Sequence, residues 1–297
     1  MTNQIFLIFL SLISTLNHKL IPDWDFILIT NLILAFLIIQ IVFIYESKNE
    51  FDKLQPGIIR FLRYWYPVFM IFFCFKEIYY VMIGLTPIIH DDILIKLDYW
   101  IFGFNPTVAL KAISNPLLTE FLQIFYSFFY VMPVIFGLEL YLWHRYKEFK
   151  FASFVIFFGF YISFIGYLIL PAIGPRFVLH DFYSINSELP GIWITNTLRD
   201  IINLGESIPT VSRVAEIVAQ RDAFPSGHTI IILLIVYLSK KIKSNSFYFY
   251  LPYAIIMIFS TVYLRYHYVI DLIGGLLFAL ITIIITNLLY SVRWKKS

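Results

Sequence analysis

The chain has 297 residues, of which 60% are hydrophobic and only 14% are charged, and its formal net charge is +3. A soluble domain carries about 25% charged residues, so this composition excludes an ordinary water-soluble protein and indicates that lipid covers most of the surface. The small net charge gives no reason to expect a nucleic-acid partner. The single cysteine, Cys74, excludes an intrachain disulfide.

The predicted elements are membrane helices, and the fold class is all-α, a polytopic membrane helix bundle. A spanning helix needs about 20 mostly apolar residues, and seven segments meet this requirement. The stretch 5–16 is shorter, and both an interfacial helix and a marginal span stay open for it. The seven strong segments are 26–45, 61–85, 117–143, 151–171, 224–240, 247–265 and 269–290.

Basic residues cluster on one side of the predicted bundle. Thirteen of the 22 lysines and arginines fall in four regions, 46–63, 144–150, 240–246 and the tail from 293. If the seven helices alternate, these regions share one side, which the positive-inside rule makes cytoplasmic. We therefore expect an integral protein of a bacterial inner membrane, with loops 86–116, 172–223 and 266–268 outside the cytoplasm.

The first of these outer loops contains an amphipathic stretch, "IIHDDILIKLDYWIFGFNP". Six large apolar residues recur there at helical spacing, which predicts a helix lying on the bilayer. We expect this helix to serve packing rather than catalysis. The six are Ile89, Ile93, Leu97, Trp100, Ile101 and Phe104.

Chemistry-bearing residues collect at the outer ends of three predicted spans. In "RDAFPSGHT", Ser226 and Gly227 expose backbone N–H groups at a helix N-terminus, which favours an anion. His228, in the same turn, is placed to transfer a proton. In "LRYHYVID", His267 and Asp271 are four residues apart and share a helix face. Such a carboxylate can hold an imidazole in one tautomer and leave the other nitrogen free to attack.

Two arginines add phosphate-binding capacity at the same ends. Arg176 in "LPAIGPRF" and Arg265 in "LRYHYVID" carry planar forks suited to phosphate oxygens. Taken singly, each residue is explained as a polar anchor, a turn or a helix-stabilising pair. A metal site is the competing interpretation, but the arginines repel a cation and a third ligand is missing. We therefore predict an anion site without a metal or cofactor.

The intact Pro225–His228 stretch and the later His-x-x-x-Asp pair resemble the type 2 phosphatidic acid phosphatase (PAP2) superfamily of membrane lipid phosphatases and phosphotransferases. The family pattern is KxxxxxxRP, then PSGH, then SRxxxxxHxxxD. The third motif is present as Ser260, His267 and Asp271, with Thr261 in place of the arginine. The resemblance covers about residues 86–290.

The first motif departs from the family pattern. Arg176 is followed by Phe177 instead of proline, and Ile169 stands where the lysine belongs. The motifs around Arg176 and His267 look more like the branch that includes inositol phosphoceramide synthase, whereas the glycine of PSGH is more typical of the phosphatases. We expect Arg221 to supply the missing positive charge, in preference to Lys76.

The resemblance implies a six-helix core within a catalytic domain over 61–297, with 1–60 adding N-terminal membrane segments. It implies that His267 attacks phosphorus, that His228 moves the proton and that Asp271 orients His267. Phosphate binding then falls to five residues, Arg176, Arg221, Ser226, Gly227 and Arg265.

The expected activity is cleavage of a lipid phosphate ester or pyrophosphate through a phosphohistidine at the outer membrane face. The alternatives are transfer of a phospho-headgroup to another lipid and non-enzymatic binding or transport of a lipid phosphate. The oriented His267 favours an enzyme, because binding alone needs only cations. The expected partners are the lipid substrate and the bilayer, and the oligomeric state is not predicted.

Overall fold

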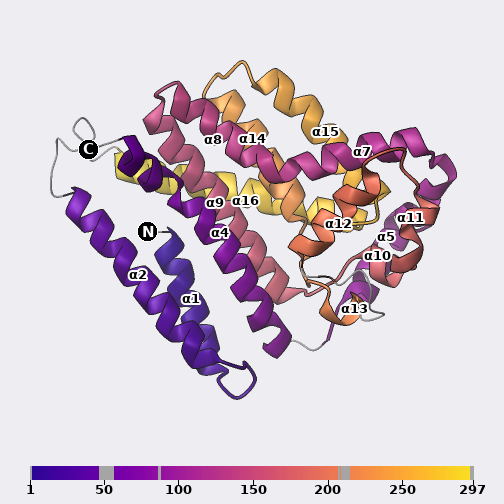
Figure 1. The fold of residues 1–297 in the computed structure, drawn as a ribbon, viewed down its shortest axis with the longest axis horizontal. Helices are drawn as coiled ribbons and strands as arrows, with labels where there is room; N and C mark the ends of the chain where they lie inside the picture. Colours follow the sequence, from indigo (N-terminus) through magenta and orange to yellow (C-terminus); the bar gives the residue numbers. More distant parts are fainter. Residues whose placement is uncertain (1, 47–56, 86–87, 207, 209–214, 295–297) are drawn as a thin grey trace. The chain divides into compact units, whose positions relative to one another are not determined.

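A computed structural model describes residues 2–46, 57–85, 88–206, 208 and 215–294 (Figure 1). Throughout these residues the regular structure is helical and no strand occurs, so the predicted all-α fold class is confirmed. The chain divides into two compact units, Met1–Pro87 and Ile88–Ser297. The segment 61–85, which the prediction groups with the catalytic domain, lies in the first unit.

The first unit consists of helices α1 (Thr2–Leu16), α2 (Trp24–Glu46) and α4 (Gly57–Leu85). α1 packs along α2 and also contacts α4. One polar contact lies inside this apolar packing, because Nδ2 of Asn31 donates to Oε1 of the buried Glu77 over 2.9 Å. Glu77 therefore takes part in the contacts between the helices of this unit.

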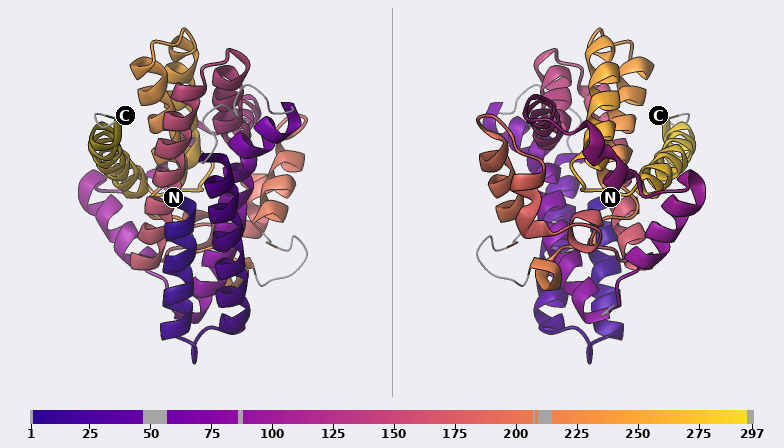
Figure 2. Two further views of the ribbon diagram at one scale, coloured as in Figure 1. Left: turned by 90° about the vertical axis from the view of Figure 1, so that its left-hand side faces the viewer. Right: turned by 90° about the vertical axis from the view of Figure 1, so that its right-hand side faces the viewer.

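The second unit is a bundle centred on α14 (Gly227–Lys241). This helix contacts α9 (Tyr146–Ile169), α15 (Phe247–Tyr263) and α16 (Val269–Trp294), and α14 and α15 run side by side in both views of Figure 2. Ile230 to Ile232, Leu234 and Ile235 are all 0% exposed. A helix that is apolar all round is buried within a bundle, and this accounts for the central position of α14.

Within the part of the chain that the structure describes, four helical stretches are long and apolar enough to cross a membrane, which makes this a membrane protein. They are Arg60–Leu85, Pro116–Leu142, Tyr146–Ile169 and Val269–Tyr290. Helix α14 is shorter than predicted, because Ser226 caps it and it begins only at Gly227. Helix α9 is longer than predicted and begins at Tyr146, since the polar residues after Arg145 continue the helix.

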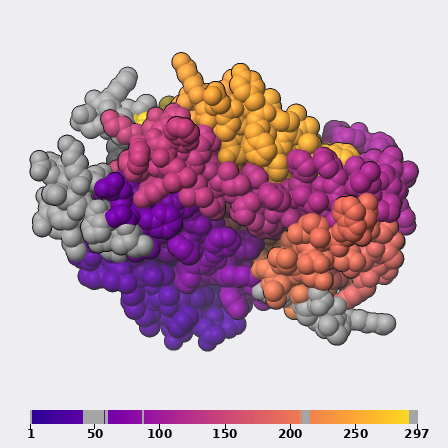
Figure 3. Space-filling model, turned by 45° about the horizontal axis from the view of Figure 1, so that its top comes forward, coloured from indigo at the N-terminus to yellow at the C-terminus, as the bar shows by residue number. Residues whose placement is uncertain are grey.

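The two long connecting segments of this unit are themselves helical. Residues 88–115 contain α5 (Asp91–Phe102), α6 (Pro106–Ala109) and the 3-10 turn η1 (Leu110–Ile113). Residues 170–223 contain α10 (Pro175–Val178), η3 (Phe182–Ser184), α11 (Ile185–Glu188), α12 (Thr195–Gly205) and α13 (Ala215–Val218). Helix α12 packs against α7 (Pro116–Phe128), and the orange surface of this segment adjoins magenta α7 in Figure 3.

Helix ends that carry basic residues meet at one end of the second unit. Nη2 of Arg145, just before α9, donates to the carbonyl oxygen of Ile242, just after α14, over 2.9 Å. Nζ of Lys241 lies 2.7 Å from Oδ1 of Asn287, near the end of α16. These contacts agree with the predicted alternation of the helices. The connector 46–63 lies mostly outside the described residues.

Candidate active site

Two histidines from different helix ends face each other in the second unit. Nδ1 of His228, in the first turn of α14, lies 3.1 Å from Nε2 of His267, in the break between α15 and α16. The ring of His228 also packs against Tyr126 and Phe129, at centroid distances of 4.9 and 4.4 Å. The structure therefore joins two predicted catalytic residues that are 39 positions apart in the sequence.

The second ring nitrogen of His267 faces two oxygen atoms. Nδ1 lies 3.0 Å from the carbonyl oxygen of Ala223 and 3.3 Å from Oδ2 of Asp271. A carbonyl oxygen and an ionised carboxylate only accept hydrogen bonds, so the proton of neutral His267 belongs on Nδ1. The lone pair is then on Nε2, facing His228. Sequence reasoning found Asp271 but missed Ala223, because a backbone carbonyl leaves no mark in the residue pattern.

Burial keeps His267 neutral. Burial lowers the pKa of His267 to about 4, against the opposing charge of Asp222, so the imidazole has a free lone pair at pH 7. Burial also raises the pKa of Asp222 to about 6, and the charge of Glu206 adds to this shift. Sequence analysis assigned neither carboxylate a role. Both reduce the positive potential around the histidine pair when ionised.

The Pro-Ser-Gly-His segment forms the N-terminus of α14. Oγ of Ser226 accepts the N–H of Thr229 over 3.2 Å, which is a standard N-cap contact. The N–H of Ser226 donates to the carbonyl oxygen of Asp271 over 3.0 Å. A Cβ on Gly227 would lie 2.4 Å from the hydroxyl of Tyr167, so glycine is needed here for close packing on α9. Ser226 thus holds two motifs together, in addition to the phosphate contact predicted for it.

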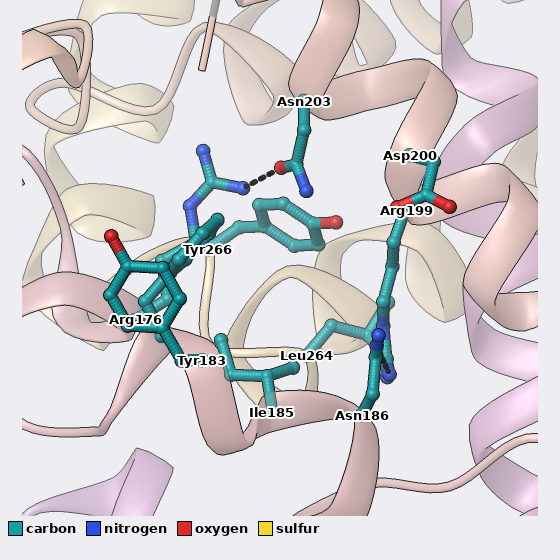
Figure 4. Close-up of a pocket in the computed structure, with 10 residues that line it drawn as sticks. Arg176, Tyr183, Ile185, Asn186, Arg199, Asp200, Asn203, Leu264 and Tyr266 are labelled. Atoms are coloured by element: carbon teal, nitrogen blue, oxygen red, sulfur yellow. Dashed lines mark hydrogen bonds between the residues drawn. The ribbon is translucent and has the colours of Figure 1, made fainter. Parts of the chain in front are cut away.

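Arg176 is 7% exposed, and its charge acts on both histidines. Its guanidinium forms an ion pair with Glu206. Nη1 also donates to Oδ1 of Asn203 over 3.4 Å, a contact drawn as a dashed line in Figure 4. Its Cζ also stacks 4.6 Å from the ring centroid of Tyr266, next to His267 in the chain. Burial opposes the charge of Arg176, but Glu206, Tyr266 and Tyr126 together raise its pKa. A phosphate at Arg176 competes with Glu206 for the guanidinium.

The sequence profile of the PAP2 superfamily matches residues 92–285, about two thirds of the chain. The chain belongs to the PAP2 superfamily. This membership indicates phosphatase-type activity on phosphate esters. No curated protein and no solved structure matched the chain.

The other two arginines predicted to bind phosphate are Arg265 and Arg221, and their described surroundings differ from those of Arg176. Arg265 is 0% exposed, has a φ of 69° and forms an ion pair with Glu188, which also contacts Lys111. Its described partners do not include the histidines, so the structure places Arg265 in a neighbouring ion cluster. Arg221 is half-buried in the turn before Ala223, and its role in phosphate binding stays a prediction.

Three buried carboxylates, which we call the carboxylate clamps, hold the segments around the PAP2 motifs. Asp91 of α5 accepts the N–H groups of Ile173 and Gly174 over 3.0 and 2.8 Å. Asp98, two turns further along α5, accepts those of Val269 and Ile270 over 2.9 and 2.8 Å. Helix α5 therefore fixes both the loop before Arg176 and the N-terminus of α16.

The third clamp is Glu120 of α7. Its carboxylate accepts the N–H groups of residues 192–194 and the hydroxyl of Thr195, at 2.7 to 3.2 Å. These bonds satisfy the N–H groups of the bend that leads into α12. Glu120 thereby positions α12, which leads to Asn203 and Glu206 beside Arg176.

Sequence reasoning missed the clamps, although α5 contained a signal for them. The apolar face that predicted an interfacial helix is exposed, with Trp100 82% accessible. The opposite face is buried and carries Asp91, Leu94 and Asp98 at positions i, i+3 and i+7. In a membrane protein, polar residues face inward when they have protein partners. Acidic residues at this spacing, opposite an apolar face, were therefore the available clue.

Proposed function

We propose that this PAP2 protein is a membrane enzyme that cleaves a lipid phosphate ester or pyrophosphate through a phosphohistidine intermediate. The observation that carries the proposal is the relay from Ala223 and Asp271 through His267 to His228. Pure binding of an anion needs cations but not an imidazole whose proton is held on one nitrogen and whose lone pair faces a second histidine. This favours catalysis over transport.

In the first step, Nε2 of His267 attacks phosphorus, the N–P bond forms and the bond to the leaving oxygen breaks. A dianionic phosphate beside His228 favours its imidazolium form, which gives its proton to the leaving oxygen. The positive charge that develops on His267 is stabilised by the Ala223 carbonyl and the Asp271 carboxylate. Arg176 balances the charge on the equatorial phosphate oxygens.

In the second step, neutral His228 takes a proton from the incoming acceptor, whose oxygen attacks phosphorus and releases His267. Water as acceptor yields free phosphate, and a lipid alcohol yields a new phospholipid. Both reactions use the same residues in the same roles. The acceptor therefore distinguishes a phosphatase from a phospho-headgroup transferase such as an inositol phosphoceramide synthase-like enzyme.

The test uses purified full-length protein in detergent with a panel of lipid phosphates and diphosphates, with and without acceptor alcohols. Released phosphate and new phospholipid are measured together, and stopped reactions with a radiolabelled phosphoryl group are checked for acid-labile label on the protein. We expect turnover and such label on at least one substrate. Turnover without label on the protein would contradict the phosphohistidine route, and the absence of any turnover would contradict the enzyme.

We further propose that the histidine pair faces the outside of a bacterial inner membrane, because the basic helix ends lie at the opposite end of the second unit. Single cysteines at Ser187 and Asn245, both exposed, in a Cys74→Ser background test this orientation. A membrane-impermeant thiol reagent applied to intact cells should label position 187 and not position 245. The reverse result would overturn the orientation.

A further inference from the structure

A pocket beside the proposed phosphoryl-transfer site shares Arg176 and Tyr266 with the surroundings of the histidine pair. Its volume is about 110 Å³, and its wall includes Arg176, Arg199, Asn186, Asn203 and Tyr266 (Figure 4). This space holds several water molecules, so a phosphate-sized group fits. Arg176 and Tyr266 belong to both sites, and a ligand in the pocket is therefore next to the reacting phosphate.

Arg199 of α12 supplies a buried positive charge to this pocket. It is 5% exposed and donates to Oε1 of Gln123, Oδ1 of Asn186 and the carbonyl oxygen of Leu189, over 3.2, 2.9 and 2.9 Å. All three described partners are neutral. A buried charge is costly without a counter-charge, so this arrangement favours an anion in the pocket.

Arg199 and Arg176 differ in whether a carboxylate balances their charge. The charge of Arg176 is balanced by Glu206. Glu120 also lies near Arg199, but its carboxylate accepts hydrogen bonds from Ile194 and Thr195 at the start of α12. Burial is the main cause that lowers the pKa of Arg199, and the charge of Arg265 adds to it. The pocket wall includes one acidic residue, the exposed Asp200, and no ion pair between Asp200 and Arg199 is described.

The remaining polar groups of the pocket are mostly donors. A guanidinium has five N–H groups, and the three described bonds of Arg199 leave two of them available. Asn186 and Asn203 each use their side-chain oxygen to accept from an arginine. Their amide N–H groups have no acceptor among the described residues, so several donors surround one small space.

We propose that this pocket is a second oxyanion subsite, separate from the phosphoryl-transfer site, with Arg199 as its cation. The anion it takes is phosphate-like, and two sources fit this chemistry. One is a second phosphate of the substrate, beyond the scissile bond, and this source rests on the proposed function. The other is the inorganic phosphate released by the reaction. If the anion is the second phosphate of the substrate, the enzyme prefers a lipid diphosphate over the matching monophosphate.

The experiment compares two lipids with identical tails, a monophosphate and a diphosphate, and measures kcat/KM for each. The variants are Arg199→Gln, which removes the charge, and Asn186→Asp, which gives Arg199 a carboxylate partner without removing its contacts. Arg145→Gln is the control, because Arg145 is likewise hydrogen-bonded to a backbone carbonyl but is paired with Glu148 and lies at the other end of the unit. Inhibition by inorganic phosphate is measured with the same proteins.

If the anion is the second phosphate, the ratio of kcat/KM for the diphosphate to that for the monophosphate falls about 10- to 100-fold in both site variants. A loss of this size is expected for a lost charged hydrogen bond. The ratio stays unchanged in Arg145→Gln. If the anion is released phosphate, the preference stays and the inhibition constant for phosphate rises by a similar factor. Unchanged preference and unchanged inhibition in both variants would overturn the subsite.

Failure of the proposed function gives a different result. Should the wild-type protein release no phosphate from either lipid, the subsite is tested by thermal stabilisation with inorganic phosphate and pyrophosphate. Stabilisation that disappears in Arg199→Gln and Asn186→Asp supports the subsite without catalysis. Stabilisation that is equal in all proteins, or absent from the wild type, overturns it.

Discussion

The histidine pair and the carboxylate clamps are both buried polar clusters of the second unit, and they differ in how fully their atoms are paired. Both oxygens of Asp91, Asp98 and Glu120 accept hydrogen bonds. In contrast, Nε2 of His228 and Oδ1 of Asp271 are buried without a partner among the described residues. Buried polar atoms are normally paired. The complete pairing of the clamps indicates a structural role, whereas Nε2 of His228 is available for the proton transfer that we propose.

The strongest test of the difference between the two clusters is to remove the proposed nucleophile. His267→Ala should lower turnover roughly 10⁴-fold or more, by analogy with other catalytic nucleophiles, while the unfolding temperature in detergent stays close to that of the wild type. Phosphate release and thermal unfolding are measured together. His180→Gln is the matched control, since His180 contacts Thr107 and has no described contact with the pair. Near-normal turnover in His267→Ala would contradict the mechanism.

The next largest effect is expected at Asp271. Asp271→Asn should lower kcat by about 10²-fold, less than the roughly 10⁴-fold known for a histidine that loses its only orienting carboxylate. The reason is that the Ala223 carbonyl still holds the proton on Nδ1. Steady-state kinetics on the purified variant measures this loss. A loss as large as that of His267→Ala would show that the carbonyl alone does not set the tautomer.

A clamp variant should change stability more than chemistry. Asp98→Asn leaves one N–H at the start of α16 without its acceptor, which costs about 1–3 kcal/mol, and we expect a lower unfolding temperature with a kcat reduced less than about tenfold. Asp92→Asn is the control on the same helix, because its contact with Lys96 is exposed and exposed ion pairs contribute little. Equal unfolding temperatures for the two variants would contradict the clamp.

The smallest expected effect concerns pH and Asp222. With a pKa of about 6, Asp222 is neutral below this pH and charged above it, so its repulsion of a bound phosphate grows as the pH rises. KM should therefore increase about three- to tenfold more between pH 5 and 7.5 in the wild type than in Asp222→Asn. The ionisation of the substrate affects both proteins equally. Identical KM profiles would exclude Asp222 from the phosphate environment.

The sequence by itself determined the class of the protein and its all-α fold, and it singled out His228, His267 and Asp271 as candidate site residues. Composition and apolar runs predict membrane helices because lipid requires long apolar stretches with internal hydrogen bonds. The PSGH and His-x-x-x-Asp patterns are local, with each motif fixed by one turn or one helix face. Their chemistry can therefore be read without knowing the packing.

The tertiary structure alone decided which polar groups surround the relay. It placed Arg176 on Glu206, Arg265 on Glu188 and the Ala223 carbonyl on His267. These contacts join segments far apart in the chain, and a backbone carbonyl or a single acidic residue leaves no periodic signal in the sequence. The direction of a side chain in a loop depends on the packing of the whole bundle. For this reason the clamps, and the charge balance of the arginines, appear only once the chain is folded.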